Sequence, residues 1–382
     1  MKNFIYLNYI NKLNENINSN NGLIQVLLGP RQVGKTTSIL KLIEDFFNTQ
    51  AHYVSADKIF NADSNWLREQ WLVSLAEKKI LIIDEIQKCH NWAEVIKSLY
   101  DESKRKKQTI RCVLLGSSSL EIQKGLTESL TGRFQLNQAY HWNYHESNKA
   151  YGLTFQEYLK FGGYPGSYFF IKGSDWANYV KNSIITTVIE KDILQFQNVK
   201  NPALFRQAFE ILMAYPAQEI SYTKLLGQLQ EKGNVELIKN YISMYEGAFL
   251  MKALEKFSAK VIKTKSSSPK ILPLAPCLYY LTIRDEYDSD ELGRVFELAV
   301  GAQLVRTGEE LFYWREGQHE VDFILKVGRK IFAIEVKSGR KKGTKGMNTF
   351  LSHFPKSHPI YITFENYSQF EKDPMGFLEK HI

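Results

Sequence analysis

The chain has 382 residues, which is too long for one ordinary hydrophobic core and predicts two or three domains. Hydrophobic residues make up 44% of the chain and charged residues 24%, which excludes a disordered protein, and no window approaches the roughly twenty apolar residues of a membrane span. The net charge of +8 is compatible with a nucleic-acid partner, although many basic proteins bind none.

The cysteines and the N-terminus indicate a reducing compartment. Cys89, Cys112 and Cys277 lie far apart in the sequence, so their spacing predicts neither a zinc site nor a disulfide framework. The first eight residues lack the continuous apolar core of a signal peptide. We therefore expect a cytoplasmic protein with no membrane partner.

The first predicted elements are a strand over residues 23–28 and a helix over residues 38–43, and the loop between them has the composition of a phosphate-binding loop. Two glycines let successive backbone N–H groups point at one anion, and the start of the helix adds partial positive charge. We expect a nucleotide as the ligand, with Lys35 at its terminal phosphates and the Thr36 hydroxyl on Mg²⁺. The residues of the predicted site are Gly29, Pro30, Arg31, Gln32, Val33, Gly34, Lys35, Thr36 and Thr37.

Two carboxylates follow a later strand. After a short strand over residues 51–55 and a helical stretch around residues 66–72, four consecutive aliphatic residues lead into Asp84 and Glu85. Such a run is typical of a strand that is buried on both faces of a parallel sheet and ends at its carboxyl edge. Asp84 is predicted to hold Mg²⁺ through its water shell, and Glu85 to orient or deprotonate the attacking water.

Two further residues are candidates for contact with the γ-phosphate. The strand over residues 111–117 ends at Ser117, which either senses the γ-phosphate or caps the helix that follows. Arg133 lies just past the last core strand. It either supplies positive charge to the γ-phosphate of a neighbouring subunit or pairs with a surface carboxylate, and its spacing leaves both alternatives open.

Four motifs in order resemble a group of prokaryotic AAA-type ATPases. They are G-P-R-Q-V-G-K-T-T at residues 29–37, I-D-E-I-Q at 83–87, L-L-G-S at 114–117 and T-G-R at 131–133. The resemblance implies an α/β fold with an N-terminal P-loop ATPase domain over residues 1–140. It also implies a homo-oligomer in which Arg133 acts in trans, and Ser117 as the sensor.

The middle of the chain is predicted to hold two helical regions. Residues 141–200 form a connector with a forced Gly-Gly-Tyr-Pro turn at 162–165, to which we assign no chemistry. Helical segments within residues 201–260, followed by a stretch that suits a β wing, predict a winged-helix-like domain. Its last helix carries Lys239 and Asn240 against Glu236 and Glu246, so contact with protein is at least as well supported as contact with DNA.

Residues 320–327 and 330–337 alternate between polar and apolar side chains around Gly328-Arg329, which predicts a hairpin with a two-residue turn of type II′. With Val327 opposite Lys330, Asp322 faces Glu335 and Glu320 faces Lys337 on one polar face. Facing carboxylates repel unless a positive charge lies between them. A divalent metal is one candidate, and a surface ladder balanced by lysines is the alternative.

This carboxylate–lysine pattern resembles the restriction-endonuclease-like nucleases, with Glu297 as an additional metal ligand beside Asp322 and Glu335, and with Lys337 as a catalytic residue. The AAA-type ATPases named above commonly end in a domain of unknown function with this nuclease-like fold, here expected over residues 261–382. An expected Asp-Gly element is missing between Lys270 and Leu292, where the sequence reads I-L-P-L-A-P. Residues 326–345 include eight basic residues and one acidic residue, which suits phosphate-backbone contacts or a solvated edge.

Two hypotheses follow for the whole chain. In the first, an oligomeric ATPase gates a metal-dependent nuclease that cleaves DNA or RNA. In the second, the ATPase is a regulatory or signalling switch, and its C-terminal domain only binds a partner or a nucleic acid.

Overall fold

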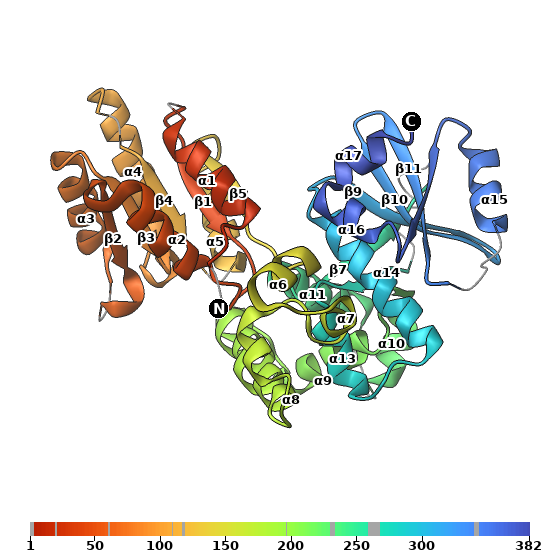
Figure 1. The fold of residues 1–382 in the computed structure, drawn as a ribbon. Coiled ribbons are helices and arrows are strands. Elements are labelled where there is room, and N and C mark those ends of the chain that lie inside the picture. Colours follow the sequence, from red (N-terminus) through yellow and green to blue (C-terminus); the bar gives the residue numbers. More distant parts are fainter. Residues whose placement is uncertain are drawn as a thin grey trace. The chain divides into compact units, whose positions relative to one another are not determined.

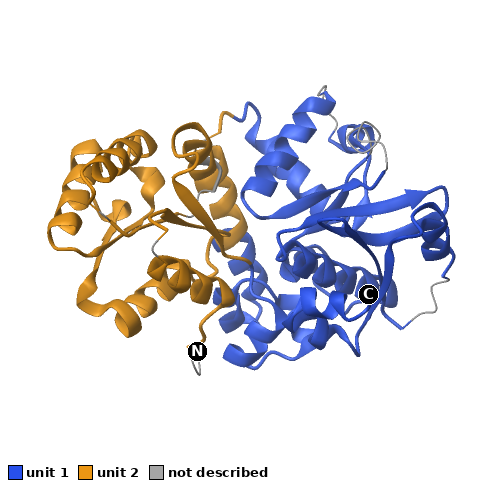
Figure 2. Cartoon of the chain, turned by 90° about the horizontal axis from the view of Figure 1, so that it is seen from above, with its two compact units in different colours: residues 1–2, 141–183, 199–382 blue, residues 3–140, 184–198 orange. Residues whose placement is uncertain are grey.

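The computed structural model describes residues 4–19, 21–59, 62–108, 110–116, 119–195, 197–229, 234–258, 268–339 and 344–382. The chain divides into two compact units (Figure 2). Unit 2 comprises residues 3–140 and 184–198, and unit 1 comprises residues 1–2, 141–183 and 199–382. No helix among the described residues is both long and apolar enough to span a membrane.

Unit 2 is built on a five-stranded parallel sheet with the strand order β2-β3-β4-β1-β5 (Figure 1). All residues of β1, β3 and β4 are buried, because helices cover both faces of the sheet centre, as the aliphatic runs predict. Strand β4 lies between β1 and β3, so the phosphate loop and the Asp84-Glu85 pair leave the sheet two strands apart at the same edge. The strands are β1 (Ile24–Leu28), β2 (Ala51–Ser55), β3 (Ile80–Asp84), β4 (Cys112–Leu115) and β5 (Phe134–Gln138).

The helices of unit 2 alternate with its strands. They are α1 (Asn8–Asn18), α2 (Lys35–Leu42), α3 (Ser64–Ala76), α4 (Trp92–Arg105) and α5 (Ser119–Ser129). Helix α3 begins at an Asp63 side chain that accepts hydrogen bonds from the backbone N–H groups of Asn65 and Trp66.

The predicted connector over residues 141–200 is divided between the two units (Figure 2). Residues 184–198, which include the π-helical segment η7 (Val188–Leu194), belong to unit 2. Their apolar side chains Ile184, Val188 and Ile193 are all buried. This stretch therefore contributes to the core of unit 2 although it lies more than forty residues beyond the last strand of the sheet.

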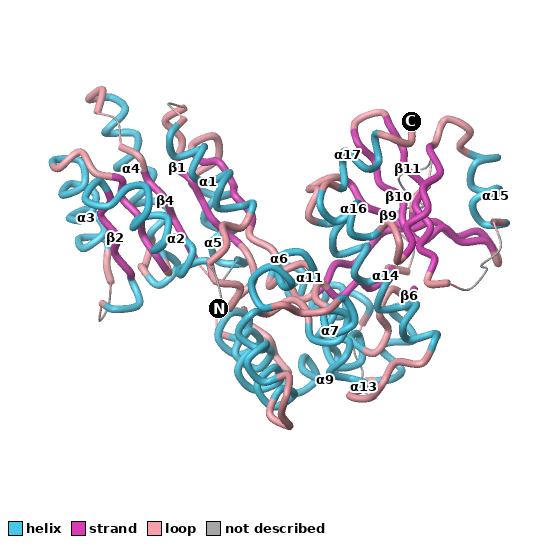
Figure 3. The backbone as a smooth tube through the Cα atoms, in the orientation of Figure 1, coloured by secondary structure: helices cyan, strands magenta, loops and turns pink. Residues whose placement is uncertain are grey.

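Unit 1 contains a seven-stranded sheet with the order β12-β11-β10-β9-β7-β8-β6. Figure 3 draws its strands in magenta. The boundary that we expected at residue 260 falls inside this sheet, because β7 pairs with β9. The strands are β6 (Gln218–Glu219), β7 (Met251–Lys256), β8 (Lys270–Pro273), β9 (Glu310–Glu316), β10 (His319–Val327), β11 (Lys330–Lys337) and β12 (His358–Thr363).

The helices of unit 1 include two that begin with capping boxes in the connector, α6 (Tyr144–Tyr151) and α7 (Phe155–Phe161). Gly163 follows them with a φ of 119°, and a Cβ there would lie 2.4 Å from the Cβ of Ala275, so this turn requires glycine. The other helices are α8 (Trp176–Asn178), α9 (Pro202–Met213), α10 (Tyr222–Gln228), α11 (Val235–Gly247), α13 (Pro276–Ile283), α14 (Ser289–Val305), α15 (Lys345–His353), α16 (Tyr367–Lys372) and α17 (Pro374–Glu379).

The β10–β11 hairpin has the predicted register, with Val327 opposite Lys330 and a φ of 58° at Gly328. Its alternation is broken by a bulge between Val321 and Ile324 in the pairing with β9. Consequently Val321 packs in one hydrophobic cluster with Ile324, whereas Phe323 packs in the cluster on α14. The strict alternation that we expected over residues 320–327 would place Val321 and Phe323 on one apolar face. This expectation is wrong, because a bulge shifts the alternation and has no clear signature in this sequence.

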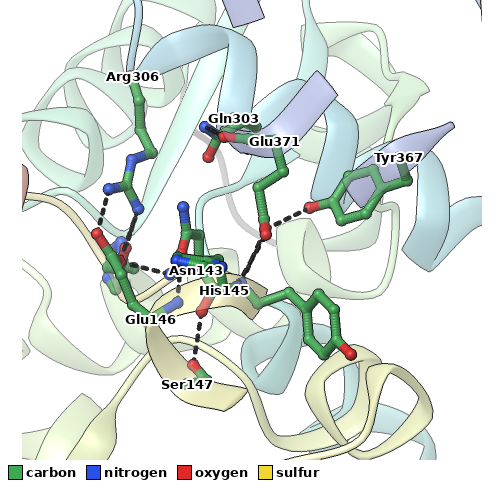
Figure 4. Close-up of polar contacts among 10 residues, drawn as sticks. Asn143, His145, Glu146, Ser147, Gln303, Arg306, Tyr367 and Glu371 are labelled. Atoms are coloured by element: carbon green, nitrogen blue, oxygen red, sulfur yellow. Dashed lines mark hydrogen bonds and ion pairs between the residues drawn. The ribbon is translucent and has the colours of Figure 1, made fainter. Parts of the chain in front are cut away.

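A buried polar cluster ties α6 to α14 and α16 within unit 1 (Figure 4). The Glu371 carboxylate accepts hydrogen bonds from the backbone N–H groups of Tyr144 and His145, each at 2.8 Å, and from the Tyr367 hydroxyl at 3.0 Å. Arg306 donates two hydrogen bonds to Glu146, at 2.6 and 3.0 Å. The start of the connector is thus fastened to the C-terminal part of the chain by charged groups.

Candidate functional site

The phosphate loop lies between β1 and α2, and its shape depends on its two glycines. Gly29 has a φ of 157°, and a Cβ there would lie 2.5 Å from the carbonyl oxygen of Ala139, so no larger residue fits. Gly34 has a φ of 89° at the N-cap of α2, in the left-handed region that favours glycine. The loop therefore ends at a helix N-terminus whose free N–H groups can receive an anion.

Lys35 is buried, with 7% of its surface exposed, and is folded back onto the loop. Its Nζ donates hydrogen bonds to the carbonyl oxygens of Gly29 and Pro30, at 2.9 and 2.8 Å. Burial lowers the pKa of Lys35 to about 8, although the carboxylates of Glu85 and Asp192 oppose this shift. An incoming phosphate would supply a negative partner to this amine in place of neutral carbonyl groups.

Asp84, at the end of β3, faces the loop. Its Oδ2 accepts hydrogen bonds from the hydroxyls of Thr36, at 2.8 Å, and Tyr53, at 2.9 Å. The charge on Asp84 adds to burial in raising the pKa of Tyr53, which stays protonated as a donor. The two oxygens predicted to share Mg²⁺, one on Thr36 and one on Asp84, are already in contact, so this donor set fits a hard divalent cation.

Glu85 adopts a left-handed conformation with a φ of 53°, which turns the chain sharply after β3. Its carboxylate accepts a hydrogen bond from the Gln87 side chain, and its backbone N–H donates to Asp84 Oδ1 at 2.9 Å. A residue held in this sparsely populated conformation is typical of a functional site. The orientation of Glu85 is therefore fixed by its neighbours.

Arg31 of the loop forms a bidentate ion pair with Asp192, which the sequence analysis did not single out. Arg31 Nε lies 2.8 Å from Asp192 Oδ2, and Nη2 lies 2.7 Å from Oδ1. Asp192 is 4% exposed, and it raises the pKa of Arg31 by hydrogen bonding. The sequence contained one signal for this pair. Asp192 lies four positions after Val188 and three after Ile189, so on a helix it shares their apolar face. A carboxylate in such a position needs a partner.

The two candidates for contact with the γ-phosphate differ. Ser117 lies outside the described residues. Arg133 pairs with Asp101 of α4, with Nε 2.8 Å from Oδ1 and Nη2 3.0 Å from Oδ2, which lowers the pKa of Asp101. The sequence left two alternatives for Arg133: contact with the γ-phosphate of a neighbouring subunit, or pairing with a surface carboxylate. Within one chain, Arg133 pairs with the carboxylate of Asp101. Arg133 and Asp101 line a shallow surface hollow together with Ser98, Lys104 and Arg105.

A lysine side chain, Lys270, lies among the carboxylates of the predicted acidic site in unit 1. The Lys270 ammonium at the start of β8 is 1% exposed and lies 2.5 Å from a carboxylate oxygen of Glu297 and 3.2 Å from one of Glu320. It also donates a hydrogen bond to the backbone carbonyl oxygen of Asp322, at 3.2 Å. Burial lowers the pKa of Lys270, but the surrounding carboxylates raise it by more, so the amine stays charged.

The remaining predicted residues have other contacts. Asp322 Oδ2 accepts a hydrogen bond from the backbone N–H of Val336 at 2.7 Å, and Lys337 Nζ lies 3.1 Å from Glu335 Oε1. Among the described residues no three histidine, cysteine or carboxylate side chains form a group that could hold a metal. The residues predicted as metal ligands, Glu297, Asp322 and Glu335, thus interact with a lysine or with the backbone.

Three family models match successive parts of the chain. A model described as an AAA domain matches residues 21–159, and models of two domains of unknown function, DUF8612 and DUF4143, match residues 152–282 and 292–375. None of these descriptions names a nuclease. The chain therefore has an AAA-type P-loop ATPase domain followed by two regions of unknown function.

The relatives of the chain are prokaryotic and uncharacterized. MJ1544 of Methanocaldococcus jannaschii is 26% identical over 329 residues, which cover 79% of this chain and 72% of that protein. Rv2008c of Mycobacterium tuberculosis is 27% identical over 332 residues, or 82% of this chain and 70% of the relative. Among solved structures, the Walker-type ATPase PABY2304 of Pyrococcus abyssi aligns with a TM-score of 0.48 at 14% identity, over 74% of this chain and 96% of that one.

Proposed function

We propose that this protein is an ATPase that hydrolyses Mg²⁺–ATP in unit 2 and uses the cycle to control unit 1. The observation that carries the proposal is the convergence of the phosphate loop and β3. Lys35 and Thr36 come from the loop, Asp84 and Glu85 from the strand, and Thr36 Oγ1 lies 2.8 Å from Asp84 Oδ2. This arrangement supports hydrolysis as well as binding, because a carboxylate follows the metal-binding position.

Each residue has a defined task in this mechanism. The Lys35 ammonium leaves the carbonyl oxygens of Gly29 and Pro30 and binds phosphate oxygens. Thr36 and Asp84 would hold Mg²⁺, which would neutralise charge on the phosphates. Glu85 orients the attacking water and accepts its proton. Ser117 senses the γ-phosphate, as its place after β4 suggests.

We further propose a homo-oligomer in which Arg133 exchanges Asp101 for the γ-phosphate of a neighbouring subunit. The Arg133 and Asp101 side chains are 28% and 38% exposed, so a phosphate of a neighbouring subunit can reach the guanidinium and compete with Asp101 for it. Arg133→Ala is then expected to lower turnover by about a hundredfold or more while ATP binding persists. Mixing this variant with an excess of Glu85→Gln subunits tests whether Arg133 acts between chains.

For unit 1 we favour a partner-binding or nucleic-acid-binding role over metal-dependent cleavage. The observation behind this choice is Lys270, which already balances Glu297 and Glu320. The α9, α10 and α11 helices with the β6-β8-β7 strands support a winged-helix-like contact surface. The nuclease hypothesis requires DNA or RNA cleavage with Mg²⁺ or Mn²⁺ that Glu335→Ala abolishes, and absence of such cleavage in the wild type would reject it.

The primary experiment measures phosphate release from ATP by the full-length protein with and without Mg²⁺. We expect turnover in the wild type and loss of both binding and turnover in Lys35→Ala. The matched control is Lys41→Ala on the exposed side of the same helix, where the lysine pairs with Glu44 and Asp45. Equal turnover in wild type and Lys35→Ala would show that the loop has been assigned wrongly.

A further inference from the structure

The segment over residues 184–198 is held against two elements of the nucleotide site. Its Asp192 side chain accepts two hydrogen bonds from Arg31 of the phosphate loop. Its helical part, η7, packs against α5, the helix that follows β4 and the predicted sensor Ser117. The chain enters the segment from unit 1 at residue 183 and returns to unit 1 at residue 199.

From this arrangement we infer that the Arg31–Asp192 pair is a nucleotide-sensitive latch, which holds the segment over residues 184–198 on the phosphate loop and releases it when a nucleoside triphosphate binds. The inference rests on the proposed function, since it assigns a regulatory output to the same site. It gives the chemistry of the loop a direct mechanical connection to unit 1.

The charges around the loop explain why a bound triphosphate would weaken the Arg31–Asp192 ion pair. Both cations of the loop contact protein acceptors: Lys35 two carbonyl oxygens and Arg31 the Asp192 carboxylate. The Asp192 carboxylate lies 2.7 Å from the Arg31 guanidinium of the phosphate loop, and its charge opposes the lowering of the pKa of Lys35. Phosphate oxygens would compete for the Arg31 guanidinium and repel the Asp192 carboxylate.

Arg31 and Asp192 are buried to different extents, so the two side chains respond differently when the pair separates. The Arg31 side chain is 25% exposed and can turn to a ligand in the open site, whereas the Asp192 side chain is 5% exposed. Losing two charge-assisted hydrogen bonds is costly for a carboxylate in such a buried position. Release of Arg31 therefore favours movement of the segment that carries Asp192, and not only rotation of one side chain.

Thermodynamic reciprocity supplies the first test. If triphosphate weakens the latch, removing the latch must tighten triphosphate binding. Asp192→Asn keeps the size of the side chain and removes its charge, and we expect it to bind ATP about tenfold more tightly, within the usual range of coupling between sites. If Asp192 served only to position Arg31 for the phosphates, the same variant would bind ATP more weakly.

Hydrogen exchange of the segment supplies the second test. In the full-length wild type, amides of residues 184–198 are expected to exchange about tenfold faster with Mg²⁺–ATP than without, since charged hydrogen bonds of this kind are worth at least one factor of ten. Asp192→Asn should exchange rapidly in both states, and Asp192→Glu, which keeps the charge, should retain part of the response. Glu102→Gln is the matched control, because it removes one carboxylate from the exposed pair with Lys106 on α4.

The outcomes separate the two proposals. Failure of the wild type to bind ATP would refute the proposed function itself. Binding of ATP without a change in exchange over residues 184–198, or weaker or unchanged ATP affinity in Asp192→Asn, would refute the latch and leave the ATPase assignment intact. Normal far-UV circular dichroism of each variant would show that the comparison is made between folded proteins.

Discussion

Replacing Glu371 by Gln is expected to change how the stability of the protein depends on pH. Glu371 is 2% exposed, and burial raises its pKa to about 7 from an ordinary value of 4.5, against the opposing effect of the N–H groups of Tyr144 and His145. The folded state therefore binds this proton more tightly than the unfolded state does. The resulting stability is fully present below about pH 4.5 and is lost as the pH rises through about 7.

The size of this effect follows from the shift in pKa. At about 1.4 kcal/mol for each pKa unit, a rise from 4.5 to about 7 corresponds to about 3 kcal/mol, of which roughly 2–3 kcal/mol falls between pH 5 and pH 8. The Glu371→Gln side chain is neutral throughout this range. On going from pH 5 to pH 8, the wild type should thus lose about 2–3 kcal/mol of unfolding free energy that the variant keeps.

The measurement is urea unfolding of the full-length protein at several pH values, followed by circular dichroism and tryptophan fluorescence. Glu365→Gln, at an exposed position two residues before α16, is the control and should match the wild type. A wild type and a Glu371→Gln variant with parallel stability profiles from pH 5 to pH 8 would refute the reasoning. A wild type that gains stability relative to the variant as the pH rises would show that the hydrogen bonds outweigh burial.

Three further outcomes test other parts of the structure. Glu85→Gln should bind ATP but lower phosphate release by about a hundredfold or more, and normal release would remove Glu85 from the mechanism. Lys270→Met removes the cation beside the buried Glu297 carboxylate and should lower the unfolding free energy by about 3 kcal/mol. Lys239→Met in an exposed pair should cost less than about 1 kcal/mol, and equal losses would contradict the buried-cation interpretation. Gly163→Ala places a Cβ against Ala275 at a φ of 119° and should cost about 1 kcal/mol or more in the same unfolding assay, and an unchanged midpoint would contradict this turn geometry.

The sequence by itself determined the elements whose pattern is local. The run over residues 80–83 predicted a strand buried on both faces, and Gly328 predicted the hairpin turn whose register the structure confirms. The loop from Gly29 to Thr36 could be recognised because phosphate binding requires certain residues at fixed spacing. Such features depend on neighbours within a few residues, so they can be found without knowledge of the fold.

The tertiary structure decided which distant charges meet. Arg31 pairs with Asp192, which is 161 residues later in the sequence, and Lys270 pairs with Glu320, which is 50 residues later. No rule of sequence spacing connects these positions. A bulge after Val321 also shifts which side chains share a face of the sheet. These contacts depend on how separate segments pack, and burial then makes each pair obligatory, because a charge removed from water must have a partner.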